Sequence, residues 1–442
     1  MKKHFYLPVC KKYELPPNMT DRLDMLILGA TGFTGKHCIA PIAKLSKAHG
    51  RNLTWGVAGR SESKLKDVLD EVGKEIGQDL SKIPLVIADI HDDDSLKSMA
   101  EKTKCVINCC GPYRFLGEAV VKACIAAGTH HVDVSGEPQY MEKVQLEQSE
   151  EAEKKGVYVV SACGFDSIPS DLGVVFLEQK FEGTLNSVET YLKRWEEGEV
   201  AASGPAGNYG TWHSAVYGLA HAAELKTIRR MLYPERLPKF EPQLQHTALP
   251  HKVDLEPGWA LPFPGSDKSV VRRTQRYFYD TNSKRPVQVD TYFMVDSIWI
   301  VLLMAFFGSI FVLLTKFKWG IQLLLKYPGL FSGGLFGTEN PSEEKISKYW
   351  FSITFRGKGW KGDKQDGPEN REIVGRVKGR NPAYGTTCIA LVLSAIMILT
   401  EKNKLPPKGG VYPPGALFAK TTLINELNEN EVTFEILSQK DI

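Results

Sequence analysis

Short apolar runs alternate with helix-like stretches over the first part of the chain. Six candidate strands follow one another at Met25–Leu28, Leu53–Ala58, Leu85–Ala88, Cys105–Cys109, His131–Val134 and Val157–Ser161. Helical patterns separate them at Thr34–Lys47, Ser61–Ile76, Ser95–Lys102, Glu118–Ala127 and Met141–Lys155. The strands are apolar almost throughout, as expected when helices cover both faces of a sheet. The repeated strand–helix order predicts an α/β fold built on a Rossmann-type, doubly wound parallel sheet.

The pattern changes after Gly183, and we expect a second domain of the α+β type there. Its predicted strands are Ser187–Trp195, Pro286–Val295, Trp350–Phe355 and Glu372–Lys378. Thr211 is a candidate N-cap for a helix over Trp212–Met231, and Asp267 is a candidate cap for a helix that ends at Tyr279. The proline-rich stretch Leu237–Pro264 is expected to be irregular.

The chain therefore divides into four predicted parts. They are a leader (1–24), a dinucleotide-binding domain (25–183), a substrate or dimerisation domain (184–385) and a C-terminal part (386–442) that returns to the first domain. The C-terminal part consists of an apolar helix at Thr386–Thr400, a turn-rich loop at Gly409–Gly415, a helix at Thr421–Asn428 and a strand at Val432–Leu437. The apolar helix is short for a membrane span, so we expect it to be buried in protein.

One uncharged apolar run, Ser297–Thr315, lies inside the second domain. It is nearly as long as the ~20 residues that cross a hydrocarbon core. Lys316 and Lys318 follow it, and the indoles of Trp299 and Trp319 lie near its ends, as at a membrane interface. Because the segments after it look like parts of the same unit as the N-terminal sheet, a single crossing would separate them across the bilayer. We therefore predict attachment to one membrane surface, with burial in the protein as the second alternative and a true span as the third.

Composition excludes some classes of protein. Hydrophobic residues make up 43% and charged residues 24% of the chain, which is typical of a folded protein, and a net charge of +3 favours no nucleic-acid partner. The eight cysteines include no Cys-x-x-Cys pair, so we interpret them as free thiols of a reducing compartment and predict no metal site.

A glycine motif follows the first predicted strand. Its residues are Gly29, Ala30, Thr31, Gly32, Phe33, Thr34 and Gly35. In such a motif the first glycine makes the turn, the second admits a pyrophosphate and the third lets the helix pack on the sheet. Backbone N–H groups at the helix start then face the phosphates. The motif's place between a strand and a helix predicts a dinucleotide site.

The end of the second strand indicates which dinucleotide binds. NAD sites commonly place a carboxylate there, whereas this strand runs into Arg60 and Ser61, with Lys64 one turn later. A guanidinium suits a 2′-phosphate, so NADP is preferred over NAD. Asp89 and Ile90 are expected beside the adenine, and the segment Cys110, Gly111 and Pro112 beside the nicotinamide ribose.

Four residues near the strand ends are candidate proton donors for hydride transfer: Tyr113, Asp133, Glu137 and Asp166. Each has an alternative structural interpretation, because an acid at this edge often caps the next helix. None of the sixteen tyrosines has a lysine four positions later, which disfavours the mechanism of short-chain dehydrogenases.

The set of motifs resembles the saccharopine dehydrogenase-like oxidoreductase family over nearly the whole chain. The matching stretches are Gly29–Gly35, Val57–Ser61, Asn108–Arg114, Val132–Glu137, Gly164–Gly173, Val270–Gln275 and Pro413–Ala416. The resemblance implies relatives among mycobacterial trans-acting enoyl reductases, and animal members that associate with lipid droplets and membranes. It does not carry over an amino-acid substrate.

Two functions remain open on these grounds. The first is an NADP-dependent oxidoreductase that acts on a lipid-derived enoyl or carbonyl compound at the cytosolic face of a membrane or lipid droplet, with the endoplasmic reticulum or the mitochondrion as possible locations and a homodimer as a possible state. The second is a catalytically weak or inactive nucleotide-binding protein of a membrane surface, with a structural or redox-sensing role.

Overall fold

The computed structural model describes residues 22–442 except 166, 199–203, 206, 363–364 and 366. Most of the predicted leader lies outside this range. The first strand begins at Leu23, two residues before the predicted start of the dinucleotide-binding domain at residue 25.

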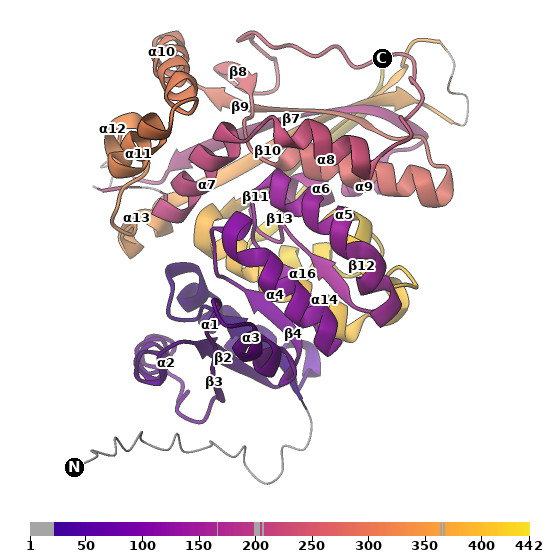
Figure 1. The fold of residues 1–442 in the computed structure, drawn as a ribbon. Helices are drawn as coiled ribbons and strands as arrows, with labels where there is room; N and C mark the ends of the chain where they lie inside the picture. Colours follow the sequence, from indigo (N-terminus) through magenta and orange to yellow (C-terminus); the bar gives the residue numbers. More distant parts are fainter. Residues whose placement is uncertain (1–21, 166, 199–203, 206, 363–364, 366) are drawn as a thin grey trace, which may run out of the picture.

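A seven-stranded sheet forms one half of the molecule (Figure 1). In spatial order its strands are β12 (Gly410–Tyr412), β6 (Tyr158–Val160), β5 (His130–Asp133), β4 (Thr103–Asn108), β1 (Leu23–Leu28), β2 (Trp55–Gly59) and β3 (Leu85–Ile87). All neighbours are parallel, and Leu28 pairs with Ala58 on one side and Asn108 on the other. The strand order therefore reverses beside β1, where open sheets of this kind bind their ligands. The predicted Rossmann-type sheet is confirmed.

Helices cover both faces of this sheet. They are α1 (Phe33–Leu45), α2 (Glu62–Ile76), α3 (Asp93–Ala100), α4 (Tyr113–Ala127) and α5 (Pro138–Lys155), with the short turn η1 (Ala48–Gly50) after α1. Met25 and Ile27 of β1 belong to the core with α1 and α2, whereas Leu26 and Leu28 belong to the core with α3 and α4. Both faces of β1 are thus buried, which explains its uninterrupted apolar sequence.

A second, mixed sheet of six strands forms the other half. In spatial order it contains β13 (Val432–Asp441), β11 (Arg371–Arg380), β10 (Tyr349–Trp360), β7 (Thr184–Glu196), β9 (Gln288–Val295) and β8 (Trp259–Pro262). Only β7 and β9 run parallel, and the other neighbours are antiparallel. The short strand β8 lies within the stretch that the sequence predicted to be irregular, because its pairing with β9 is a contact that local proline content does not reveal.

The helices of this half are α6 (Ile168–Lys180), α7 (Tyr209–Ala220), α8 (Glu224–Leu232), α9 (Asp267–Asn282), α10 (Ile298–Leu314), α11 (Lys318–Lys326), α12 (Pro328–Phe331) and α13 (Glu343–Lys348). The prediction of one helix over 212–231 was wrong, since α7 ends at Ala220 and α8 begins at Glu224. The N-cap of α7 is Asn208, whose side chain accepts a hydrogen bond from the Gly210 N–H, and Thr211 lies inside the first turn.

The C-terminal part joins the two halves. It contains the π-helical turn η2 (Pro382–Thr386), α14 (Thr387–Thr400), η3 (Lys402–Lys404), α15 (Pro414–Phe418) and α16 (Leu423–Glu429). Helix α14 is almost wholly buried against α1, β4 and β5, as expected for a core helix. The predicted loop at Gly409–Gly415 instead supplies β12, which pairs with β6, and β13 pairs with β11 in the second sheet.

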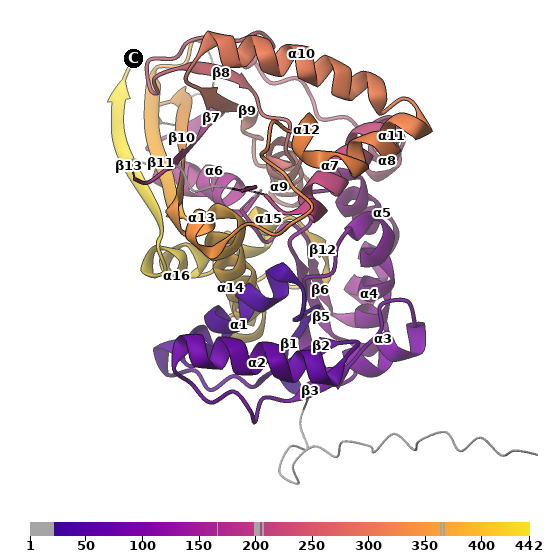
Figure 2. The ribbon, with the colours of Figure 1, turned by 90° about the vertical axis from the view of Figure 1, so that its left-hand side faces the viewer.

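Helix α10 lies at the end of the molecule farthest from β1–β3, along its outer edge (Figure 2). Only Val301 and Leu314 of its side chains are buried, whereas Trp299, Leu303 and Phe306 are 72%, 56% and 62% exposed. Among the described residues, one helical stretch, Pro382–Thr400, has the length and hydropathy of a membrane span, but it is mostly buried inside the protein. Helix α10 is apolar but shorter than that.

Candidate functional site

The turn between β1 and α1 has the geometry of a phosphate-binding loop. Gly29 has a φ of +83°, and its amide donates to the Ala58 carbonyl at 3.0 Å. A Cβ at Gly29 would lie 2.5 Å from the Cys110 Sγ, and one at Gly35 would overlap the Gly29 carbonyl oxygen. These two glycines therefore hold the turn and the helix in place, as the sequence predicted.

The start of α1 fits a bound pyrophosphate. Its N-cap is Gly32, which has no side chain to bond the first-turn N–H groups, and the first turn carries no acid. A Cβ at Gly32 would meet only the Gly29 carbonyl oxygen, at 3.2 Å, so the space in front of the helix is open. Unpaired N–H groups and the positive end of the helix dipole favour an anion at this position.

The end of β2 offers cations where an adenosine ribose would lie. Arg60 and Lys64 are exposed, and no acid stands between Gly59 and the helix cap Ser61. The Ser61 hydroxyl accepts from the Lys64 amide at 3.4 Å and begins α2, while Thr31 of the glycine loop lies close to Gly59. This arrangement fits a 2′-phosphate, which needs a guanidinium fork and a hydroxyl or amide donor.

The residues predicted beside the adenine and the nicotinamide ribose follow β3 and β4. The Asp89 carboxylate accepts from the His91 amide at 3.1 Å and thereby shapes the turn before α3, with Ile90 half-buried beside it. The Cys110 amide donates to the Asn108 side chain at 3.0 Å, and burial raises the pKa of the Cys110 thiol to about 12. Gly111 and Pro112 lead directly into α4.

Tyr113 lies in the core rather than at the surface of the predicted site. Its hydroxyl donates to the Asn108 carbonyl at 2.9 Å, and its ring lies 5.7 Å from that of Tyr140. Burial raises the pKa of Tyr113 well above its usual value, and the nearby charge of Asp133 adds to this effect. Its hydroxyl proton is thus used in a hydrogen bond within the protein, which favours a structural role for Tyr113.

The carboxylates of Asp133 and Glu137 are also engaged within the protein. Asp133 is fully buried and accepts from Ser161 and Tyr140 hydroxyls at 2.9 and 3.0 Å, while burial raises its pKa to about 6. Glu137 accepts from the Tyr113 and Arg114 amides, each at 3.0 Å, so it caps the start of α4. Asp166 lies outside the described residues.

Several residues that the sequence did not single out surround the same region. The Ser214 hydroxyl of α7 donates to Glu137 at 2.8 Å, which brings the neighbouring His213 over the start of α4. On the other side of the glycine loop, the Phe33 ring packs against Tyr384 of η2, with 4.5 Å between ring centres. No local pattern points to these contacts, because they join segments far apart in the sequence.

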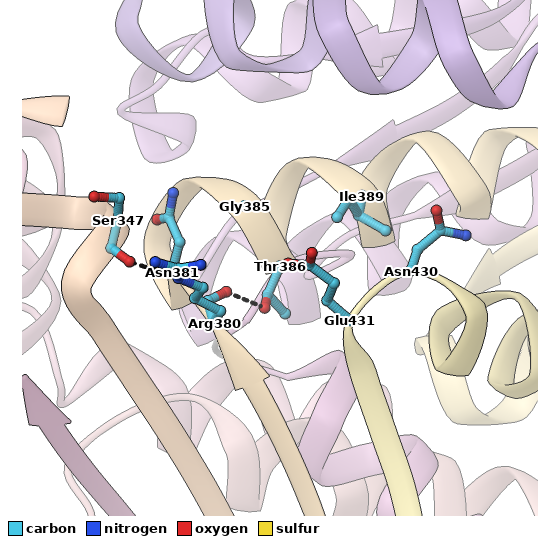
Figure 3. A pocket seen from close by; sticks show the side chains of 8 residues that line it. All are labelled: Ser347, Arg380, Asn381, Gly385, Thr386, Ile389, Asn430 and Glu431. Carbon is cyan, nitrogen blue, oxygen red and sulfur yellow. Dashed lines mark hydrogen bonds between the residues drawn. The ribbon is translucent and has the colours of Figure 1, made fainter. Parts of the chain in front are cut away.

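A hollow of about 240 Å³ lies beside η2 and the start of α14 (Figure 3). It is lined by η2, the end of β11 and the loop before β13, and Arg380 closes one side by donating to the Ser347 carbonyl at 2.7 Å. Its lining residues include none of the residues predicted to bind the cofactor.

The seven described cysteines, all except Cys10, are free thiols, in agreement with the sequence. Among the described residues, one His–carboxylate group has metal-ligand geometry: His49, Glu426 and Glu429. Glu426 is already paired with Arg51 there, and Nε2 of His49 lies 2.9 Å from the Glu429 carboxylate, so contacts within the protein account for the group.

The parallel sheet, the open glycine loop and the helix start beside it define a dinucleotide-binding protein of the Rossmann type. A family profile described as the saccharopine dehydrogenase NADP binding domain matches residues 25–160. A human saccharopine dehydrogenase-like oxidoreductase is 39% identical over 95% of this chain and 98% of its own length. The chain belongs to the saccharopine dehydrogenase-like oxidoreductase family.

Two further comparisons extend this result. A lipid droplet localized protein of Caenorhabditis elegans is 36% identical over 95% of this chain and 100% of its own length. The apo saccharopine dehydrogenase (L-Glu forming) of Saccharomyces cerevisiae shares the fold, with a TM-score of 0.52 at 15% identity over 95% of this chain and 100% of that one.

Proposed function

We propose that this chain is an NADP-dependent oxidoreductase that reduces a lipid-derived enoyl or carbonyl compound at the cytosolic surface of a membrane or lipid droplet. The preference for NADP rests on Arg60, Ser61 and Lys64 at the end of β2. The description of the matched profile, an NADP binding domain, supports it.

The proposed location at a lipid surface rests on one observation, the exposure of apolar side chains on α10. Ten large apolar side chains of this helix are at least one-third exposed, and they lie on all sides of it: Ile298, Trp299, Ile300, Leu302, Leu303, Met304, Phe306, Phe307, Val312 and Leu313. Each gains about 1.5–3 kcal/mol on complete transfer from water to an apolar medium. Phe317, Trp319 and Leu330 extend the exposed apolar surface beyond α10, and Lys316 and Lys318 lie beside them.

The chain before and after α10 folds into one body, since α14 packs on α1 and β12 pairs with β6. Insertion of α10 into one leaflet agrees with this arrangement, and a single crossing does not.

The names of relatives support two locations. The worm relative's name refers to the lipid droplet, and the name of a 32% identical Arabidopsis thaliana relative refers to the mitochondrion. A Mycobacterium tuberculosis protein whose name describes a trans-acting enoyl reductase is 35% identical over 35% of this chain, which supports an enoyl substrate.

A specific observation favours a second function, that of a nucleotide-binding surface protein without turnover. The side chains of Tyr113, Asp133 and Glu137 all bond to groups within the protein. One experiment separates the two functions: the purified protein is mixed with NADPH and a lipid extract, and NADPH absorbance is followed. Consumption that depends on the extract supports the oxidoreductase, whereas bound but unconsumed NADPH supports the second function.

Flotation with liposomes tests the lipid surface. The double variant Leu303→Lys/Phe306→Lys should remain with the soluble fraction while the wild type floats. The control Ile87→Lys changes a side chain that is 52% exposed in β3, at the end of the molecule opposite to α10, and it should float like the wild type. A wild type that does not float and elutes as a dimer would instead indicate that a second copy covers α10.

A further inference from the structure

Three lysines lie within the apolar surface that α10, α11 and α12 form toward the end of the molecule opposite to β3 (Figure 2). Lys316 lies just after the end of α10, and Lys318 and Lys326 are the first and last residues of α11. All three side chains are exposed, and the exposed rings of Phe317 and Trp319 stand beside them. Cationic groups thus interrupt a surface whose other exposed side chains are mostly apolar.

Within the part of the chain that the structure describes, these three lysines have no carboxylate partner. Residues 297 to 338 include no aspartate or glutamate, and neither does α7, which packs against α11. Asp296 precedes α10 and is separated from the lysines by the length of that helix, about 25 Å at a rise of about 1.5 Å per residue. Elsewhere Lys284 and Lys348 each pair with a glutamate at 2.7 Å. The positive charge of the apolar surface is therefore not neutralised from within.

The charge of the whole chain points to the same surface. The chain has 55 basic and 52 acidic side chains, so its net charge of +3 equals the charge of Lys316, Lys318 and Lys326. The remaining charges balance in number. An anionic partner is therefore attracted to the apolar surface of α10–α12, where cations stand without acids, more than to the molecule as a whole.

A second copy of the chain does not match this surface. Two such surfaces placed face to face would bury apolar side chains but would offer no carboxylate to the lysines of either copy. Burying a charge without a partner is costly, and like charges at an interface repel. A lipid surface with an anionic boundary satisfies both requirements, because it receives the apolar side chains below the headgroups and the ammonium groups among them.

We propose that the partner of the α10–α12 surface is a lipid surface rich in anionic phospholipid headgroups, which bind Lys316, Lys318 and Lys326. This inference rests on the proposed attachment to a lipid surface and deepens it by naming the class of headgroup. The cytosolic leaflet of cell membranes carries such lipids. Each lysine close to an anionic surface strengthens partitioning about fivefold, which corresponds to about 1 kcal/mol.

Flotation of the purified full-length protein with two kinds of vesicle tests the proposal. One kind is phosphatidylcholine alone, and the other is phosphatidylcholine with phosphatidylserine at about 7:3. The wild type should partition onto the anionic vesicles on the order of 100-fold more strongly, from three lysines at about fivefold each. Lys316→Gln/Lys318→Gln/Lys326→Gln should bind both kinds alike, at the level of the wild type on phosphatidylcholine, because its apolar side chains remain.

A matched control separates local charge from net charge. Lys82→Gln/Lys97→Gln/Lys102→Gln removes three exposed lysines that lie in or beside α3 and β3, at the opposite end of the molecule (Figure 2). This variant has the same net charge as the first one but should keep the preference of the wild type for anionic vesicles. Equal losses in the two triple variants would overturn the proposal. Because all six side chains are exposed, both variants should keep the Tm of the wild type.

The lipid composition distinguishes failure of this inference from failure of the proposed function. Equal binding of the wild type to both kinds of vesicle would overturn the assignment of anionic headgroups and leave lipid attachment intact. Binding to neither kind would overturn lipid attachment itself. Phosphatidylglycerol, a different headgroup with one negative charge, should replace phosphatidylserine without loss, and about 1 M salt should remove the preference by screening. A preference confined to phosphatidylserine would contradict recognition by charge.

Discussion

The amide of Gly415 donates to the carboxylate of Asp171 at 2.6 Å, across 244 residues of sequence. The same carboxylate oxygen accepts from the Thr274 hydroxyl at 2.8 Å. A Cβ at Gly415 would lie 2.6 Å from the other carboxylate oxygen, so only glycine fits there without a shift. Three of the sequence stretches that identify the family, in α6, α9 and α15, thus meet at one buried acid.

The pH dependence of stability tests this junction. Burial raises the pKa of Asp171 to about 6, above its usual 3.8, so the folded state favours the protonated acid. Relative to Asp171→Asn, whose amide does not titrate, the wild type should be most stable below about pH 4. It should lose up to about 3 kcal/mol as the pH rises through 6, since one pKa unit corresponds to about 1.4 kcal/mol.

Denaturant unfolding of both proteins between pH 4 and 7 measures this difference. The difference between the two proteins is the informative quantity, because all other titrating groups are shared. A constant difference across this range would show that Asp171 has an ordinary pKa in the folded protein.

The second prediction separates two glycines of the phosphate loop. Gly32→Val should abolish NADPH binding with little change in Tm, because its side chain points into the space that the pyrophosphate needs. Gly35→Ala should instead destabilise the fold by about 1–3 kcal/mol, because its methyl group overlaps the Gly29 backbone. Calorimetric titration and thermal unfolding check both. Native NADPH affinity in Gly32→Val would mean that the phosphates bind elsewhere.

The third prediction concerns cofactor choice. Arg60→Ala should weaken NADPH binding by about 1–3 kcal/mol, as for a lost charge-assisted hydrogen bond, and should affect NADH much less. Lys74→Ala is a suitable control because it removes an exposed cation at the other end of α2. Equal losses for NADPH and NADH in Arg60→Ala would refute the NADP assignment.

The fourth prediction decides the role of Tyr113. Tyr113→Phe removes the hydrogen bond to the Asn108 carbonyl and should cost about 1 kcal/mol of stability, with NADPH affinity unchanged. If the hydroxyl were the proton donor, the variant would lose turnover in a working assay and keep its stability. Comparing Tm with the rate of NADPH consumption distinguishes the two roles.

The first sheet could be predicted from the sequence because its signals are local. The strand segments Leu26–Leu28 and Cys105–Ile107 are buried on both faces, so each reads as an unbroken apolar run. Gly29, Gly32 and Gly35 follow at the spacing of a phosphate loop, and Ser61 marks the start of α2. The family resemblance was confirmed for the same reason, since its motifs are short and continuous.

The tertiary structure alone decided which polar residues face one another. Tyr113, Asp133 and Glu137 follow strand ends as predicted, yet their partners are Asn108, Tyr140 and the first amides of α4. Likewise β12 is a strand only because β6 lies beside it, and His213 reaches the start of α4 only because Ser214 bonds Glu137. Apolar periodicity and glycine turns are properties of neighbouring residues, so the sequence by itself determines them. The partner of a buried polar group depends on segments that meet only after folding, which is why the structure was needed to place it.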